Sequence, residues 1–195
     1  MTLVENLLII IGLSLDVFAA MECQGSLVRK VDKKHLSLVT IIIVVAHLLA
    51  LYLGYFLATL LSKNGDTSEE VFIGHILAII ILFGLGIRLI VKAIINEQIN
   101  EHLEQHLGIK RFIPLTGLTG IYTLVAGFAF GFIGTTIWQL LIMLAVALVL
   151  FVVGGMYCGF RFGFESKRRA YVIGAILLII AGIDMIIRLI LNTGM

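Results

Sequence analysis

Four polar side chains interrupt long apolar stretches of this 195-residue chain. They are Asp16 in "GLSLDVFAAMECQG", His47 in "IIIVVAHLLAL", Arg88 in "GLGIRLIV" and Asp184 in "AGIDMIIRLI". A charged group that leaves water needs a partner or a ligand, because its uncompensated burial is costly. Carboxylate oxygens and neutral imidazole nitrogens also bind divalent first-row metal ions. These residue types therefore point to a cation site or to ion pairs in an apolar environment.

The composition predicts an integral membrane protein. Hydrophobic residues make up 61% of the chain and charged residues only 13%, with one proline and a mean hydropathy of +1.14. Soluble domains are much less apolar. The net charge of +2 is too small to indicate a nucleic-acid partner. Cys23 and Cys158 both lie in apolar segments and indicate neither a disulfide framework nor a zinc site.

Six apolar runs are long enough to span a bilayer, which takes about 20 helical residues. They are continuously apolar rather than alternating, which predicts helices and excludes a barrel. The first run has no basic segment before it and is interpreted as a retained span rather than a signal peptide. The expected class is an all-α polytopic membrane protein with spans at about 4–24, 38–61, 71–93, 112–135, 137–160 and 170–191.

The connections between these spans differ in charge. The first, third and fifth, "RKVDKKH", "NEQINEHLEQHLGIKR" and "RFGFESKRR", hold most of the Lys and Arg residues. The positive-inside rule makes these loops cytoplasmic and places both termini outside. In the third loop, Glu97, Glu101 and Glu104 share a helical spacing beside His102 and His106. A solvated surface helix is the first interpretation of this loop, and a weak cation-collecting patch is the alternative.

The two halves of the chain can be laid over each other. "GIRLIVKAI" at 86–94 matches "GIDMIIRLI" at 182–190, and "LDVFAA" at 15–20 lies over "IYTLVA" at 121–126. With three spans in each half, the halves enter the membrane from opposite sides, as in many transporters. We therefore expect one membrane domain, 1–195, with repeats at 1–94 and 112–195 and a cytoplasmic linker at 95–111. In this alignment Asp16 corresponds to Tyr122, and Arg88 corresponds to Asp184.

Asp16 is the strongest candidate for an ion site. It lies about a dozen residues into its span, roughly 18 Å along a helix, too deep to reach water easily. A helix places it on one face with Gly12, Ala20 and Cys23, small neighbours that let another helix approach. The side chain is interpreted as a cation ligand or proton acceptor, with a buried salt bridge or a protonated acid as the alternative. Arg88 either extends to the interface or forms an ion pair with Asp16 that a cation or proton disrupts.

His47 and Asp184 each allow two interpretations. His47 lies near the expected depth of Asp16, as a nitrogen ligand or as a hydrogen-bonded contact between helices. Asp184 serves an ion path or pairs with Arg188 one turn later. Glu22 is placed near the cytoplasmic end of its span, where interfacial water can reach it. No HExxH, GxSxG, P-loop or dinucleotide motif occurs, so the sequence predicts neither an enzyme nor ATP-driven transport.

"GLSLDVFAA", followed by Gly25, and "GLGIRLIV" together resemble signatures of the MntP-type manganese efflux pumps, which are small six-span bacterial membrane proteins. The resemblance covers nearly the whole chain in span number, loop length and charge pattern. It implies a multi-pass protein of the bacterial inner membrane, an inverted three-plus-three repeat and manganese export. Asp16 and Arg88 match the family pattern. The second-span position that is acidic in the family is His47 in this chain. The fourth-span positions that are Leu-Asp-Ala in the family are Ile121, Tyr122 and Thr123 here.

The leading hypothesis is a secondary-active exporter of divalent manganese or a related transition metal. Its metal ligands are Asp16, His47 and Asp184, and Arg88 and Tyr122 are the gating or charge partners. A site with one Asp and one His binds a divalent ion more weakly, or favours a borderline metal, because manganese prefers carboxylate oxygens. The alternatives are a non-transporting membrane partner or sensor on the same scaffold and a carrier of a small organic cation. The lipid bilayer and the metal cation are the expected partners, while proton coupling and a homo-oligomer stay open.

Overall fold

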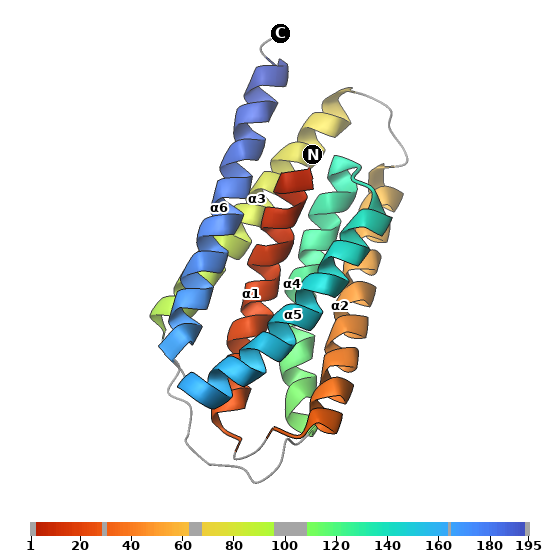
Figure 1. Ribbon diagram of the computed structural model, residues 1–195. Helices are drawn as coiled ribbons and strands as arrows, with labels where there is room; N and C mark the ends of the chain where they lie inside the picture. Colours follow the sequence, from red (N-terminus) through yellow and green to blue (C-terminus); the bar gives the residue numbers. More distant parts are fainter. Residues whose placement is uncertain (1–2, 29–30, 63–67, 96–108, 164, 194–195) are drawn as a thin grey trace.

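The computed structural model describes residues 3–28, 31–62, 68–95, 109–163 and 165–193. These residues form an elongated bundle of six long helices (Figure 1). Each helix is long and apolar enough to cross a membrane. The predicted all-α, multi-pass membrane fold is therefore confirmed. The helices are α1 Leu3–Ser26, α2 Lys33–Ser62, α3 Ser68–Ile94, α4 Ile109–Ile133, α5 Ile137–Phe162 and α6 Glu165–Thr193.

α2, like α6, starts five residues before its predicted position, which is the largest difference from the expected spans. Asp32 caps this helix end: its carboxylate accepts a hydrogen bond from the Lys34 backbone N–H at 3.0 Å, and its carbonyl accepts one from Leu36 at 2.9 Å. A second Asp32 oxygen lies 2.9 Å from the His35 ring. The side-chain bond to His35, then the backbone bond to Lys34, holds the pKa of the Asp32 carboxyl below its usual value. The polar cap extends the helix beyond its apolar run.

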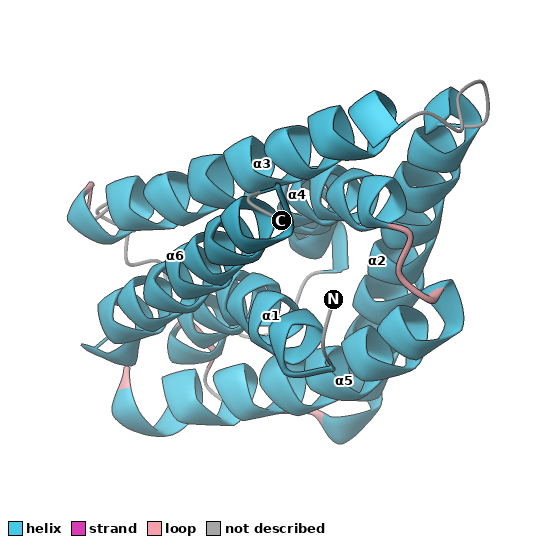
Figure 2. Cartoon of the chain, turned by 90° about the horizontal axis from the view of Figure 1, so that it is seen from above, coloured by secondary structure: helices cyan, strands magenta, loops and turns pink. Residues whose placement is uncertain are grey.

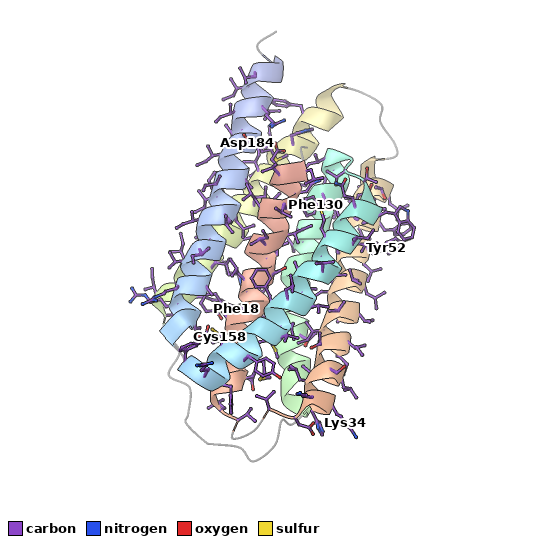
Figure 3. All side chains as sticks on the ribbon, viewed as in Figure 1. Phe18, Lys34, Tyr52, Phe130, Cys158 and Asp184 are labelled. Carbon is purple, nitrogen blue, oxygen red and sulfur yellow. The ribbon has the colours of Figure 1, made fainter. Side chains whose placement is uncertain are left out.

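Successive helices alternate in direction through the bundle (Figure 1). α1 and α4 run in opposite directions, and the first residue of α1 and the last of α6 lie at the same end of the bundle (Figure 1). The starts of α2 and α6 lie at the other end, with Lys34 exposed there (Figure 3). Basic residues of the described chain thus gather opposite the termini, as the charge pattern predicts. Which end faces the cytoplasm stays a prediction.

Two helix pairs pack most extensively, α1 with α5 and α2 with α4. α1 also packs against α6, and viewed along the bundle it lies between α5 and α6 (Figure 2). Side chains are buried around most of α1, so an acid in its middle is shielded from both lipid and water.

Glycines allow these close approaches. In α5, Gly155 lies against the backbone of Phe18 and Glu22, and Gly159 lies against Glu22. This contact corrects one expectation from the sequence: Glu22 is fully buried beneath α5 and is not at interfacial water. In the other pair, Gly54 of α2 lies against Leu124 and Phe128 of α4.

Gly159→Ala is expected to lower the free energy of unfolding by about 1–3 kcal/mol, the usual cost of overpacking. An added Cβ would collide with the carbonyl oxygen of Glu22, and backbone cannot move aside as a flexible side chain can. Gly84→Ala is the matched control, because a Cβ at Gly84 meets nothing within 4 Å. Thermal unfolding of the purified protein in detergent measures both. Equal melting temperatures for the two variants would contradict this packing.

Candidate ion site

Asp16 lies in the middle of α1 with its side chain only 6% exposed. Its two oxygens bind different cations of α3. Lys92 Nζ donates to Oδ1 at 2.7 Å, and Arg88 Nη1 donates to Oδ2 at 3.2 Å. The structure therefore contains the ion pair of Asp16 with Arg88 that the sequence left as one alternative, and it adds a second cation.

Arg88 and Lys92 are one helical turn apart, so both reach Asp16 from the same face of α3. Their side chains are 21% and 25% exposed, so the charges are partly withdrawn from solvent. One carboxylate against two cations leaves the cluster with a formal charge of +1. A further cation is repelled as long as both basic side chains remain in place.

Tyr122 of α4 covers the guanidinium. The Cζ atom of Arg88 lies 2.9 Å from the centroid of the Tyr122 ring, a cation–π contact. Arg88 Nη2 is buried and has no hydrogen-bond partner among the described residues. Lys92 Nζ lies 5.8 Å from the Tyr122 ring and 5.4 Å from the Tyr171 ring. The aromatic faces thus hold charges that one carboxylate cannot neutralise completely.

A small cavity of about 10 Å³ lies beside this cluster, lined by residues of α1, α3, α4 and α6 that include Asp16, Arg88, Tyr122 and Thr123. This volume is at the lower limit for one water molecule. In this conformation the charged cluster is therefore closed. Asp16 and Tyr122, which correspond in the predicted repeat, line the same space.

His47 lies in α2 and its side chain is buried, with 1% exposed. Its Nδ1 is 2.8 Å from the carbonyl oxygen of Ile43. Because a carbonyl oxygen only accepts, the ring proton is on Nδ1 and Nε2 carries the lone pair. Nε2 is buried and has no hydrogen-bond partner among the residues the structure describes.

Asp184 is far from this arrangement. It lies toward the C-terminal end of α6, at the end of the bundle where α1 begins (Figure 3), and its side chain is 42% exposed. Its Oδ2 accepts a hydrogen bond from Arg188 Nε at 3.2 Å. The same guanidinium binds the buried Glu5 of α1 through Nη2 at 2.7 Å. The pair with Arg188 is thus present, and Asp184 as a metal ligand stays a prediction.

The sequence reasoning missed Lys92 and Glu5 as partners. Lys92 stands one turn after Arg88, and this spacing could have indicated that both face Asp16. Glu5 and Asp16 are eleven residues apart, which brings them to one face of α1. Glu97, Glu101, Glu104, His102 and His106, the candidate cation-collecting patch, lie outside the described residues.

No group of three or more His, Cys, Asp or Glu side chains that could hold a metal ion occurs in the described part of the chain. The predicted ligands are therefore not assembled in this conformation. Asp16 is bound by the protein's own cations instead.

Asp16→Asn is expected to destabilise the protein by about 1–3 kcal/mol, because it leaves Arg88 and Lys92 without their counter-charge. Adding Lys92→Met should restore part of the loss, with a coupling energy of at least about 0.5 kcal/mol in a double-mutant cycle. Lys34→Met is the control, since Lys34 is exposed at the end of the bundle. Melting temperatures in detergent are measured for the wild type, the two single variants and the double variant, and for the Lys34→Met control. Additive effects of Asp16→Asn and Lys92→Met would contradict the cluster.

The chain was compared with known proteins. A family model described as "Putative manganese efflux pump" matches residues 30–186. A protein named "Putative manganese efflux pump MntP" from Methanoregula boonei is 31% identical, over 95% of this chain and 97% of the relative. Its namesakes from Bifidobacterium adolescentis and Acetivibrio thermocellus are 26% and 27% identical, over 94% and 92% of this chain and 95% and 87% of their own length. No solved structure matches.

Proposed function

Because this chain belongs to the MntP family of membrane transport proteins, we propose that it is a secondary-active exporter of a divalent transition-metal cation, manganese or a related ion. The cation leaves the cytoplasm through the bundle, and Asp16 is its central ligand. The single observation that carries this proposal is the buried carboxylate of Asp16, bound to two cationic side chains from another helix.

A charged side chain near the bilayer centre costs about 2.5–3.5 kcal/mol on insertion scales, so it is retained where it has a partner or a function. A purely structural pair needs one counter-charge. Asp16 has two, on long flexible side chains that each make one contact with it. A divalent cation carries the same total charge as Arg88 and Lys92 together. It can replace them on the carboxylate if they turn away, without changing the net charge around Asp16.

This exchange supplies two states of the site. In one state Arg88 and Lys92 close it, and in the other the metal ion binds Asp16 and the basic side chains are displaced. A ligand shifts such an equilibrium only by its difference in affinity for the two states. Arg88 and Tyr122 are then the gating partners, since the Tyr122 ring holds the guanidinium beside the site. A proton that neutralises Asp16 would release the same side chains. Metal transport could be coupled to protons in this way.

Alternating access in this proposal depends on the inverted repeat, and the helix contacts support that repeat. If Asp16 corresponds to Tyr122, then Phe18 and Glu22 correspond to Leu124 and Phe128. Gly155 lies against the first two residues, and Gly54 lies against the second two. Continuing the same alignment, the contact of Gly25 with Met156 corresponds to the contact of Gly131 with Tyr55. This shared register supports the inverted repeat, on which an exchange of conformations between the two halves depends.

The basic residues at the starts of α2 and α6 support a cytoplasmic location for that end of the bundle by the positive-inside rule. Both termini are then outside. Asp16 is reached from the cytoplasm past Lys92, and the pair of Glu5 with Arg188 lies at the opposite end of α1.

Flux into proteoliposomes that contain a metal-sensitive dye tests the transport role. We expect Mn²⁺ or Co²⁺ entry with wild-type protein and at least a tenfold lower rate with Asp16→Asn, the order of loss for a removed metal-site interaction. Asp32→Asn is the matched control, because Asp32 is outside the spans and Asn caps a helix as well as Asp. Equal flux from folded wild-type and Asp16→Asn protein would reject the role of Asp16.

A second candidate function is a non-transporting membrane partner or sensor, and the closed cluster favours it. Asp16 is fully bonded, and the adjacent cavity has room for about one water molecule. This small volume also argues against a carrier of an organic cation. If wild-type protein moves neither Mn²⁺ nor Co²⁺ in proteoliposomes while it remains folded, the non-transporting function is favoured.

A further inference from the structure

His47 is the buried polar group with the most specific geometry outside the charged cluster. The second span carries an imidazole where the family resemblance implies an acid. The ring is enclosed, with Nδ1 bound to the Ile43 carbonyl and Nε2 without a hydrogen-bond partner among the described residues. A histidine that only joins two helices would use its second nitrogen for that contact. His47 leaves this nitrogen available, at the cost of a buried acceptor that is not satisfied.

This is the arrangement of a metal-ligating histidine. Such a side chain almost always donates its other ring N–H to a carbonyl or carboxylate, which fixes the tautomer, orients the ring and raises the basicity of the ligating nitrogen. The bond of 2.8 Å to Ile43, one turn earlier on the same helix, does this before any ion is present.

The helix packing brings His47 level with Thr123, a residue of the Asp16 cavity wall. α2 and α4 run in the same direction side by side (Figure 1). The backbone of Leu51 lies against Gly127. One turn earlier on each helix stand His47 and Thr123, and Thr123 lines the cavity beside Asp16.

We propose that Nε2 of His47 and the carboxylate of Asp16 are ligands of one transported cation, and that this pair selects borderline metals, Fe²⁺, Co²⁺, Ni²⁺ or Zn²⁺, over Mn²⁺. The inference rests on the proposed transport role of Asp16 and adds the metal class. Imidazole nitrogen favours these ions, whereas manganese favours carboxylate and other oxygen ligands. Tyr122, which corresponds to Asp16 in the predicted repeat, brings no second carboxylate, so the proposed pair offers one carboxylate and one imidazole.

Competitive flux in proteoliposomes, with Co²⁺ and Mn²⁺ at equal concentration, tests the selectivity. Wild-type protein should transport Co²⁺ faster than Mn²⁺. His47→Leu should lower the Co²⁺ rate roughly tenfold or more, the order expected for a lost metal-site interaction, and leave the Mn²⁺ rate nearly unchanged. His47→Asp should favour Mn²⁺. His75→Leu, in α3, is the control for removing a histidine from a span and should keep the wild-type ratio.

A ligand measurement accompanies the flux. X-ray absorption of Co²⁺-loaded protein should show imidazole scattering that decreases in His47→Leu and not in His75→Leu. A wild-type preference for Mn²⁺ would overturn the proposal even if no His47 variant folds. An unchanged ratio of the Co²⁺ and Mn²⁺ rates in folded His47→Leu protein would also overturn it. If Asp16→Asn then still abolishes both fluxes, the transport role stands and only the metal class is wrong.

Discussion

The structure depends on one constraint, a carboxylate in the most enclosed helix of a membrane bundle that must be neutralised there. Asp16 is charged at little cost only while cations contact both of its oxygens, because an unpaired charge in an apolar interior is strongly unfavourable. Lys92 and Arg88 provide these contacts from α3, at 2.7 and 3.2 Å. The position of α3 relative to α1 is therefore linked to the charge on one side chain. Any process that neutralises or binds Asp16 weakens this link.

The polar groups around Asp16 have complementary roles in that linkage. Tyr122 stabilises the guanidinium of Arg88 in place, and Tyr171 lies near Lys92, so the cluster holds its excess positive charge against aromatic faces. His47 of α2 keeps its Nε2 without a hydrogen-bond partner among the described residues. At the other end of α1, Arg188 binds the buried Glu5. Each of these two acids on one face of α1 is thus held by basic side chains of another helix, Asp16 by α3 and Glu5 by Arg188 of α6.

Much of this arrangement was predictable from the sequence, since burial in a bilayer restricts the solutions. The six spans and the depth of Asp16 follow from the lengths and positions of the apolar runs. The cost of a buried charge made the pairing with Arg88 one of two alternatives. Lys92 was missed because a lysine near a helix end usually extends to the interface. Glu22 was misplaced because its burial depends on Gly155 and Gly159 of a distant helix. Asp16 and Asp184 lie in two separate polar clusters. This separation depends on helix register, which residue types alone do not specify.

The most direct test of the central claim is an experimental structure of the protein saturated with Co²⁺, with anomalous diffraction to locate the metal. The account predicts an anomalous peak bound to the Asp16 carboxylate and His47 Nε2, about 2.0–2.2 Å from each as for comparable first-row ions. Lys92 and Arg88 should have left the carboxylate. A metal-saturated protein in which both basic side chains still bind Asp16, with the anomalous peak elsewhere, would contradict the account.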